Sequence, residues 1–227
     1  MGGRLATPSI HASRFPDHDT MTMGGALTFG IPRRWLAVTG STNDTARDWA
    51  LVGAPQGALM VASEQTRGRG QQGKPWSSPR GKGLYASVVL RPDWPAERAA
   101  DLTILAGMAA YGALRELGVP ELSVKRPNDI LSGGKKLAGV LVESRVGRGG
   151  MDFAIAGIGI NVAQTMEELP ADVRESATSL ALVGARVSVD HVLDRLLASW
   201  SAVVNMPPAA LREGWSAAGA REKEARQ

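Results

Sequence analysis

The sequence contains no cysteine, which excludes disulfide bonds, thiolate metal sites and cysteine nucleophiles. Aromatic residues are scarce, with two tyrosines and three phenylalanines. No interleaved basic and aromatic surface of the kind that stacks single-stranded nucleic acid is therefore expected. The three histidines, His11, His18 and His191, are far apart in the chain. They are not spaced as metal ligands, and they suggest no Ser–His–Asp arrangement.

Long hydrophobic runs are also missing. No apolar stretch is long enough to span a membrane, and the N-terminus lacks the apolar core of a signal peptide. We therefore expect no membrane partner, and the lack of cysteine fits a reducing cytoplasm. A content of 44% hydrophobic and 21% charged residues is typical of a globular protein. The net charge of +4 suits a phosphate-bearing small molecule or an acidic protein partner as well as a nucleic acid.

The 227 residues allow one large domain or two small ones. Residues 1–30 mix Gly, Pro, Ser, Thr and His without apolar periodicity, which predicts a disordered tail with Met21 or Met23 as an alternative start. We expect one folded domain over residues 31–216 and a polar tail over 217–227.

Apolar periodicity and turn residues predict the elements of this domain. We expect strands at residues 35–38, 58–62, 84–90, 122–125, 136–143 and 151–162, and helices at 41–52, 96–117, 189–204 and 208–215. Glycines at 147, 149 and 150 predict a hairpin turn between the last two strands. The fold class is α+β, with a largely antiparallel mixed sheet flanked by segregated helices.

Residues 64–77 join two expected strands and contain three glycines, two arginines and a lysine. Glycine allows close approach of a ligand, and the cations suit phosphate or carboxylate; the alternative is a solvated loop. The spacing of Gly68, Gly73 and Lys74 nearly matches a P-loop. That motif needs a hydroxyl residue and a helix next, whereas Pro75 supplies neither a hydroxyl nor an amide, so a P-loop is rejected.

The strand at residues 151–162 ends in Gly157-Ile158-Gly159-Ile160-Asn161. Alternate residues of a strand share a face, so Gly157, Gly159 and Asn161 lie together. The two glycines leave room for a flat ligand on the backbone. Close packing of a helix against them is the alternative.

Lys125-Arg126-Pro127-Asn128-Asp129 is followed by Lys136-Leu137-Ala138-Gly139. Proline fixes φ and would present Asn128 and Asp129 in a definite direction; an ordinary turn is the alternative. Strict alternation puts Lys136 and Gly139 on opposite faces. A bulge between them, or a lysine reaching from the strand end, is needed for both to touch one ligand.

Together these segments, with Ser41-Thr42-Asn43, Glu64-Gln65, Gly68-Arg69-Gly70 and Trp76, resemble the catalytic domain of biotin protein ligases. Their order and spacing agree from about residue 35 to 215. The resemblance implies the biotin/lipoate ligase catalytic fold, which is class II synthetase-like. It also implies an enzyme that uses biotin, ATP and Mg²⁺ to form biotinyl-5′-AMP. That enzyme then transfers biotin to a lysine of a biotin carboxyl carrier domain of acetyl-CoA carboxylase or a related carboxylase.

The resemblance assigns residues to each substrate. For biotin it implies Ser41, Thr42, Asn43, Gln65, Gly68, Arg69, Gly70, Lys136, Gly139, Gly157 and Gly159. For ATP it implies Arg69, Gln71, Lys74, Trp76, Ser77, Lys125, Asn128, Asp129, Lys136 and Asn161. Arg69 and Lys136 are the catalytic pair, meeting the carboxylate and the α-phosphate, and Asp129 is on the magnesium–phosphate side. Two cations at this junction would offset the repulsion between the reacting anions.

Three positions depart from the family pattern. Gln71 and Lys74 stand where the family often has arginine, and Arg126 stands where it usually has tryptophan. Because Gln71 removes a cation from the phosphate loop, we expect easier release of biotinyl-AMP. Labelling of a non-cognate bystander protein no higher than background would contradict this.

The resemblance includes neither a helix-turn-helix domain nor a C-terminal β-barrel, so we expect no DNA partner. We expect the protein to be a monomer or a homodimer. Two other functions stay open. Lipoate or octanoate ligases and transferases share this fold and also act on a carrier-domain lysine. A non-catalytic biotin- or nucleotide-binding module is the second alternative.

Overall fold

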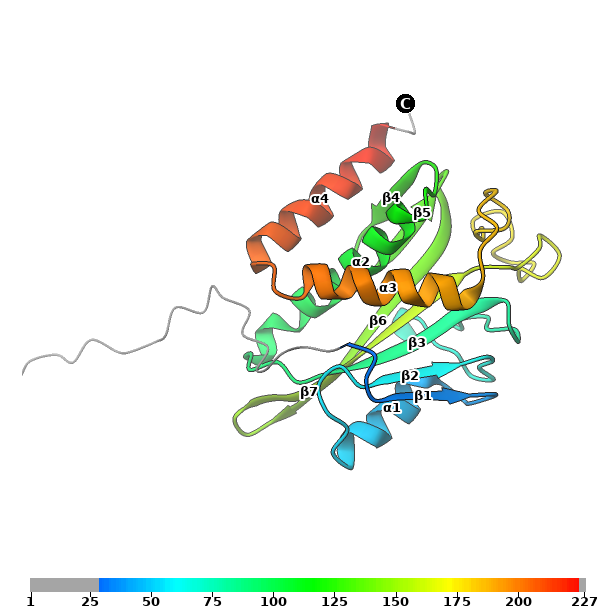
Figure 1. Cartoon of the computed structure of the whole chain (residues 1–227). Coiled ribbons are helices and arrows are strands. Elements are labelled where there is room, and N and C mark those ends of the chain that lie inside the picture. Colours follow the sequence, from blue (N-terminus) through cyan, green and yellow to red (C-terminus); the bar gives the residue numbers. More distant parts are fainter. Residues whose placement is uncertain (1–28, 225–227) are drawn as a thin grey trace, which may run out of the picture.

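The computed structural model describes residues 29–224, so residues 1–28 of the tail expected over residues 1–30 lie outside the described residues. Seven strands form one sheet in the order β1-β2-β3-β7-β6-β5-β4 (Figure 1). β1 pairs parallel to β2, and every other neighbouring pair is antiparallel. The strands are β1 (Arg33–Leu36), β2 (Leu59–Ala62), β3 (Gly83–Leu90), β4 (Leu122–Lys125), β5 (Asp129–Ser132), β6 (Lys135–Gly147) and β7 (Gly150–Asn161).

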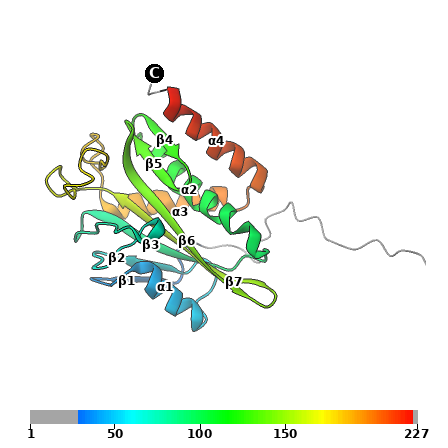
Figure 2. The ribbon, with the colours of Figure 1, turned by 180° about the vertical axis from the view of Figure 1, so that it is seen from behind.

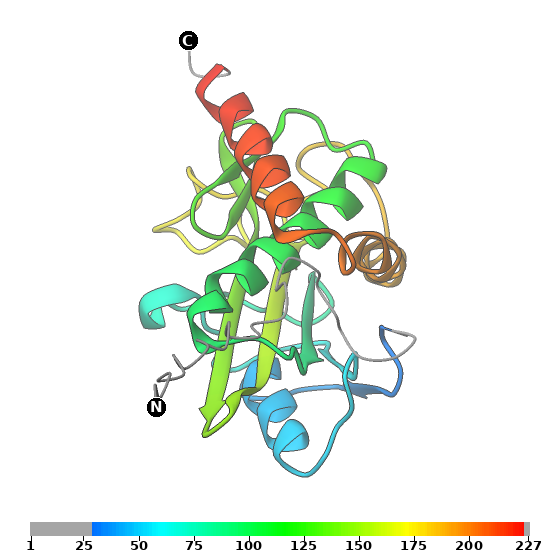
Figure 3. The same ribbon diagram turned by 90° about the vertical axis from the view of Figure 1, so that its left-hand side faces the viewer.

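Four helices cover the two faces of the sheet. The helices α2 (Ala99–Glu116), α3 (Val189–Val203) and α4 (Pro208–Glu224) lie on one face, and α1 (Thr42–Leu51) lies on the other (Figures 1 and 2). Seen from the side, α3 is almost end-on and α4 continues from it beside α2 (Figure 3). Two short 3₁₀ turns, η1 (Gln71–Gly73) and η2 (Ala96–Arg98), complete the elements. The expected α+β class, with its mixed, largely antiparallel sheet, is confirmed.

Side-chain alternation along the strands builds two apolar layers. In β3, Leu84, Ala86 and Val88 point to the large core under α2 and α3. Val89 points to a smaller cluster under α1, formed by two alanines of that helix, two alanines that follow it, Met60 of β2, and Phe153 and Ile155 of β7. The small side chains let α1 approach the sheet closely.

Phe29 belongs to the large core, although we assigned it to the tail. Its side chain is 7% exposed, and its ring centroid lies 5.4 Å from that of the fully buried Trp200. The folded domain therefore begins before residue 31, and the tail prediction is wrong at Phe29. A single aromatic residue such as Phe29 gives no apolar periodicity, so the sequence pattern does not indicate that it packs into the core.

Three element predictions also need correction. α4 continues to Glu224, beyond the expected end at residue 215 and through part of the expected polar tail. β5 was not predicted, because Asp129–Ser132 is a four-residue strand directly after a turn. β1 lies two residues earlier than expected, at Arg33–Leu36. Within the described residues, none of the helices is both long enough and apolar enough to cross a membrane.

β6 contains an irregularity between Lys136 and Gly139. Asp129 pairs with Gly139 and Ile130 with Ala138, but Leu131 pairs with Lys136, so Leu137 is an extra residue in β6. A bulge of this kind restores two side chains to one face. The Lys136 side chain lies 3.3 Å from the position that a Cβ on Gly139 would take. Of the two alternatives left open by the sequence, a bulge or a lysine reaching from the strand end, the structure shows the bulge.

Candidate functional site

Two adjoining cavities lie on the α1 side of the sheet. The small one is lined by the start of α1, by Gln65, Arg69 and Gly70, and by the glycine-rich parts of β6 and β7. The large one, of about 1070 Å³, is lined by most of residues 64–79 but not by Arg69, by Lys125–Asp129 and by residues of the segment from Gln164 to Ala177. Every residue that the resemblance assigns to biotin or ATP lines one or both cavities. Their roles remain predictions.

Gly139, Gly157 and Gly159 form the floor of the small cavity. Gly139 pairs directly with Gly159, and Leu141 pairs with Gly157. A Cβ on Gly157 would overlap Oδ1 of Asn43, and one on Gly159 would lie 2.6 Å from the indole of Trp76. Helix packing, our alternative reading, therefore holds at Gly157, where α1 approaches. At Gly159 a flat indole lies on the backbone.

Gln65 connects α1 to the segment that follows β2. Its Oε1 accepts hydrogen bonds from the backbone N of Thr42 at 2.8 Å and from Thr42 Oγ1 at 3.0 Å. Its Nε2 donates to Ser78 Oγ at 2.8 Å. Ser41 occupies the N-cap position of α1, but its side chain makes no capping hydrogen bond. Ser41 also lines the small cavity.

Ser87 is a buried site residue that the sequence reading missed. Its Oγ lies 2.8 Å from Thr42 Oγ1 and 2.7 Å from Asn43 Oδ1. Asn43 Nδ2 in turn donates to Glu143 Oε2 at 2.7 Å. A hydroxyl within the otherwise apolar strand β3 was the available signal, because buried polar groups are normally hydrogen-bonded.

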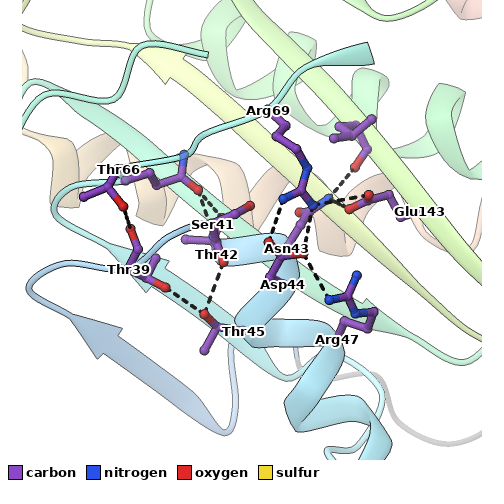
Figure 4. A network of polar contacts seen from close by, with 12 residues as sticks. Thr39, Ser41, Thr42, Asn43, Asp44, Thr45, Arg47, Thr66, Arg69 and Glu143 are labelled. Atoms are coloured by element: carbon purple, nitrogen blue, oxygen red, sulfur yellow. Dashed lines mark hydrogen bonds and ion pairs between the residues drawn. The ribbon is translucent and has the colours of Figure 1, made fainter. Parts of the chain in front are cut away.

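Arg69 lies between two carboxylates from different elements (Figure 4). Its Nη1 and Nη2 donate to Asp44 of α1 at 2.6 and 2.9 Å. Nη2 also contacts Glu143 of β6 at 3.4 Å. The hydrogen bonds from Arg69 lower the pKa of Asp44 below its usual 3.8, and the same bonds raise the pKa of the guanidinium. Neither Asp44 nor Glu143 is among the site residues that the resemblance implies.

Lys136 lies where the two cavities meet. Its Nζ is 2.7 Å from Asp129 Oδ1 and 5.3 Å from the centroid of the Trp76 ring, within the range of a cation–π contact. Five of the described residues line both cavities, and Lys136 is the only one of these five with a charged side chain. A cation is thus held at the junction by a carboxylate on one side and an indole on the other.

The far wall of the large cavity is fixed by amide side chains. Asn161 Nδ2 donates to the carbonyl of Thr178 at 2.8 Å, and Gln164 Nε2 donates to Asn161 Oδ1 at 3.1 Å. Backbone bonds from Lys136 N to Ser176 O and from Thr178 N to Lys136 O hold residues 176–178 along β6. The sequence reading identified Asn161 but neither Gln164 nor this segment.

Residues 68–76, which we call the flap, form a small hairpin over the cavities. Trp76 N donates to Gly68 O at 2.9 Å, and Gly70 N donates to Lys74 O at 2.7 Å. Gln71 and Lys74 line the large cavity from the flap. Arg126, a departure from the family pattern, lines the opposite side and donates to Ser216 Oγ of α4 at 2.7 Å.

Comparison with known proteins agrees with this geometry. The model of the biotin/lipoate A/B protein ligase family matches residues 35–161. The bifunctional ligase/repressor BirA of Bacillus subtilis is 38% identical over 161 residues, covering 70% of this chain and 50% of that protein. The biotin–[acetyl-CoA-carboxylase] ligase of Paracoccus denitrificans is 36% identical over 196 residues, covering 82% of this chain and 80% of that protein.

Solved structures give the same result. The biotin protein ligase of Aquifex aeolicus in complex with biotin and ATP superposes with a TM-score of 0.65 at 33% identity, covering 76% of this chain and 69% of that one. This chain spans about half the length of the B. subtilis protein. The matched segment contains α1, the flap and the glycine-rich strands that form the two cavities. The chain belongs to the biotin/lipoate A/B protein ligase family.

Proposed function

We propose that this chain is an ATP-dependent biotin protein ligase. The main observation in support of this proposal is the position of Lys136, which faces both the small cavity with its glycine floor and the large cavity. The small cavity would hold biotin, with Gln65 and the start of α1 as its polar wall. The large cavity would hold ATP between the flap and the segment from Gln164 to Ala177. The biotin complex and the ligase names of the relatives support this assignment.

The reaction needs two anions to meet. A carboxylate oxygen of biotin attacks the α-phosphorus of ATP, and the bond to the leaving pyrophosphate breaks, which gives biotinyl-AMP. The amine of a carrier-domain lysine then attacks the acyl carbon, an amide forms, AMP leaves, and a proton is released to solvent. The Lys136 ammonium would stabilise the negative charge that builds on the phosphoryl oxygens. The cavities would supply the alignment.

Magnesium would enter with the nucleotide. Residues 29–224 gather no group of three or more His, Cys, Asp or Glu side chains that could hold a metal ion by themselves. Asp129 faces the large cavity and is the carboxylate that would meet a metal bound to ATP phosphates. Such an ion would offset phosphate charge, while Asp129 also holds Lys136 in place.

The test is a reconstitution with purified components. We expect a carrier domain incubated with the chain, biotin and Mg-ATP to gain the mass of one biotinyl group. Pyrophosphate release should depend on both biotin and ATP. Lys136→Ala should lower this release by about 10²-fold or more, because it removes a donor to the developing charge. Lys135→Ala is the matched control, since the neighbouring Lys135 lines neither cavity.

Three results would contradict the proposal. Transfer of lipoate or octanoate in preference to biotin would favour the related activity of the same family. Binding of biotin or nucleotide, with no pyrophosphate release by either the wild type or Lys136→Ala, would favour a binding module. Equal loss of activity in Lys135→Ala and Lys136→Ala would contradict a specific role of Lys136 where the two cavities meet.

A further inference from the structure

Asp44 and Glu143 hold the same guanidinium in different ways. Asp44 accepts two hydrogen bonds from Arg69, at 2.6 and 2.9 Å. A two-point contact between an arginine and a carboxylate fixes the orientation of the guanidinium plane. Glu143 accepts one longer contact, at 3.4 Å. The first contact is strong and directional, and the second is weak.

Asp44 is also the better fixed of the two. It lies in the first turn of α1, directly after the three residues of this turn that line the small cavity. A carboxylate there is stabilised by the positive end of the helix dipole. Arg47, one turn further along α1, places its Nη2 3.2 Å from Asp44 Oδ1. Arg69, in contrast, is carried by the flap. The ion pair therefore joins the flap to the wall of the small cavity (Figure 4).

Glu143 can release Arg69 without being left unpaired. Its other oxygen, Oε2, accepts a hydrogen bond from Asn43 Nδ2 at 2.7 Å, and its side chain is 39% exposed. Two of the five N–H donors of Arg69, one on Nε and one on Nη1, take no part in these contacts. An incoming anion can therefore take the donor that Glu143 occupies and can also use a free one.

We propose that Asp44 is a positioning residue that fixes Arg69 beside the small cavity, and that Glu143 occupies the place of the substrate's anionic group until that group binds. The inference rests on the proposed function, because it needs an anionic substrate in this cavity. The anion is a carboxylate or a phosphate, and both suit the arginine fork. Arg69 touches the substrate, whereas Asp44 acts through Arg69.

The two carboxylates then have opposite effects on binding, which a purely structural role would not produce. Asp44→Asn keeps the shape but loses the charge and one of the two acceptors, so biotin affinity should fall by about tenfold. Glu143→Gln removes the competing charge while an amide oxygen still accepts from Asn43, so affinity should rise by a few fold. Isothermal titration of each full-length variant with biotin measures both changes.

The matched control is Asp48→Asn, because it makes the same charge change on the same helix. Asp48 is 73% exposed and contacts Arg47 at 3.9 Å, away from Arg69. The affinity of the Asp48→Asn variant for biotin should stay within twofold of that of the wild type. Circular dichroism of each variant checks that it folds. If Asp44→Asn does not fold, the affinity measured for Glu143→Gln tests the inference by itself.

Two further ligands identify the anion. If the biotin carboxylate displaces Glu143, the gain in Glu143→Gln disappears with biotin methyl ester, which has no charge. If phosphate displaces it, the gain is seen with ATP and not with biotin. Unchanged affinity of Glu143→Gln for both, or a change of the same sign in Asp44→Asn and Glu143→Gln, would overturn the inference. A wild type that binds neither biotin nor ATP would overturn the proposed function as well.

Discussion

Gly157 shows how a single absent side chain shapes the small cavity. Its missing Cβ gives room to Oδ1 of Asn43, which also accepts from Ser87. We predict that Gly157→Ala displaces Asn43, lowers biotin affinity by tenfold or more, and costs about 1–3 kcal/mol of stability, as overpacking usually does. Urea unfolding and titration with biotin measure these effects.

The control for this substitution is Gly149→Ala in the β6–β7 turn. A Cβ there meets no atom within 4 Å, and Gly149 does not need a positive φ. Its stability and its affinity should match those of the wild type. Equal behaviour of the two alanine variants would show that Asn43 moves aside at no cost, and that the glycine floor does not shape the cavity.

The Asp44–Arg69 ion pair predicts a pH-dependent contribution to stability. Arg69 lowers the pKa of Asp44 in the folded chain below its usual 3.8, so the folded state holds this proton less tightly than the unfolded state. The contribution is therefore fully present above pH 3.8 and is lost as the pH falls through the lowered pKa. The difference in unfolding free energy between wild type and Asp44→Asn should be constant near neutral pH and shrink in acid. A difference that stays the same throughout the acid range would contradict this.

At the scale of elements, α1 is held at both ends by side chains from elsewhere. Arg91, directly after β3, donates from Nη2 to Ala50 O at 2.7 Å and from Nε to Ala54 O at 2.9 Å. These carbonyls lie at or just beyond the end of the helix, where partners within the helix run out. We predict that Arg91→Met lowers the free energy of unfolding by about 1–3 kcal/mol.

Arg145→Met is the matched control for Arg91. Arg145 lies on the β6–β7 hairpin and forms one exposed ion pair with Asp152, at 3.4 Å. Exposed pairs of this kind contribute about 0–1 kcal/mol. Urea unfolding of both variants tests the difference, and Arg91→Lys should recover only part of the loss because lysine cannot span both carbonyls. Equal destabilisation in Arg91→Met and Arg145→Met would contradict the role of Arg91 in capping the C-terminal end of α1.

The elements were largely predictable because their signals are local. Period-two alternation placed the glycines and Asn161 on one face of β7. It left two ways for Lys136 and Gly139 to touch one ligand, and β6 contains one of them, a bulge at Leu137. Apolar periodicity predicts too short a helix α4, because the residues after Trp215 lack an apolar pattern but are rich in helix-forming Ala, Glu, Lys and Arg. The strand β5 is too short to show any periodicity.

The site was predictable as a set of residues but not as a set of contacts. The family resemblance indicated Arg69 and Lys136; Arg69 lines the small cavity, and Lys136 lines both. The partners of Arg69 lie 25 and 74 positions away in the chain, at Asp44 and Glu143. No local pattern reports such pairs, because the sheet register and the docking of α1 bring them together. The sequence therefore identified both cations and the carboxylate beside Lys136, Asp129, and missed the two carboxylates that hold Arg69.

At the scale of the whole molecule, the two cavities collect residues from most of the chain. Their walls come from α1, the flap, the β4–β5 turn, β6, β7 and the segment from Gln164 to Ala177. A ligand that fills both cavities therefore binds only the fully assembled fold. Binding to the folded state alone stabilises it by about 2.7 kcal/mol at a free concentration of 100 times Kd. For a domain of this size that corresponds to roughly 5–10 °C in Tm.

We predict that biotin and Mg-ATP together raise the Tm by more than the sum of their separate effects, because the biotinyl-AMP that the proposed reaction forms would span the junction at Lys136. Lys136→Met should reduce the joint effect to that sum while leaving the shift from biotin alone mostly in place. Lys135→Met is the control and should behave as the wild type does. Differential scanning fluorimetry measures all three proteins. A joint shift equal to the sum in the wild type would mean that the small and large cavities bind their ligands without joining them, and Lys136 would then have no role at the junction.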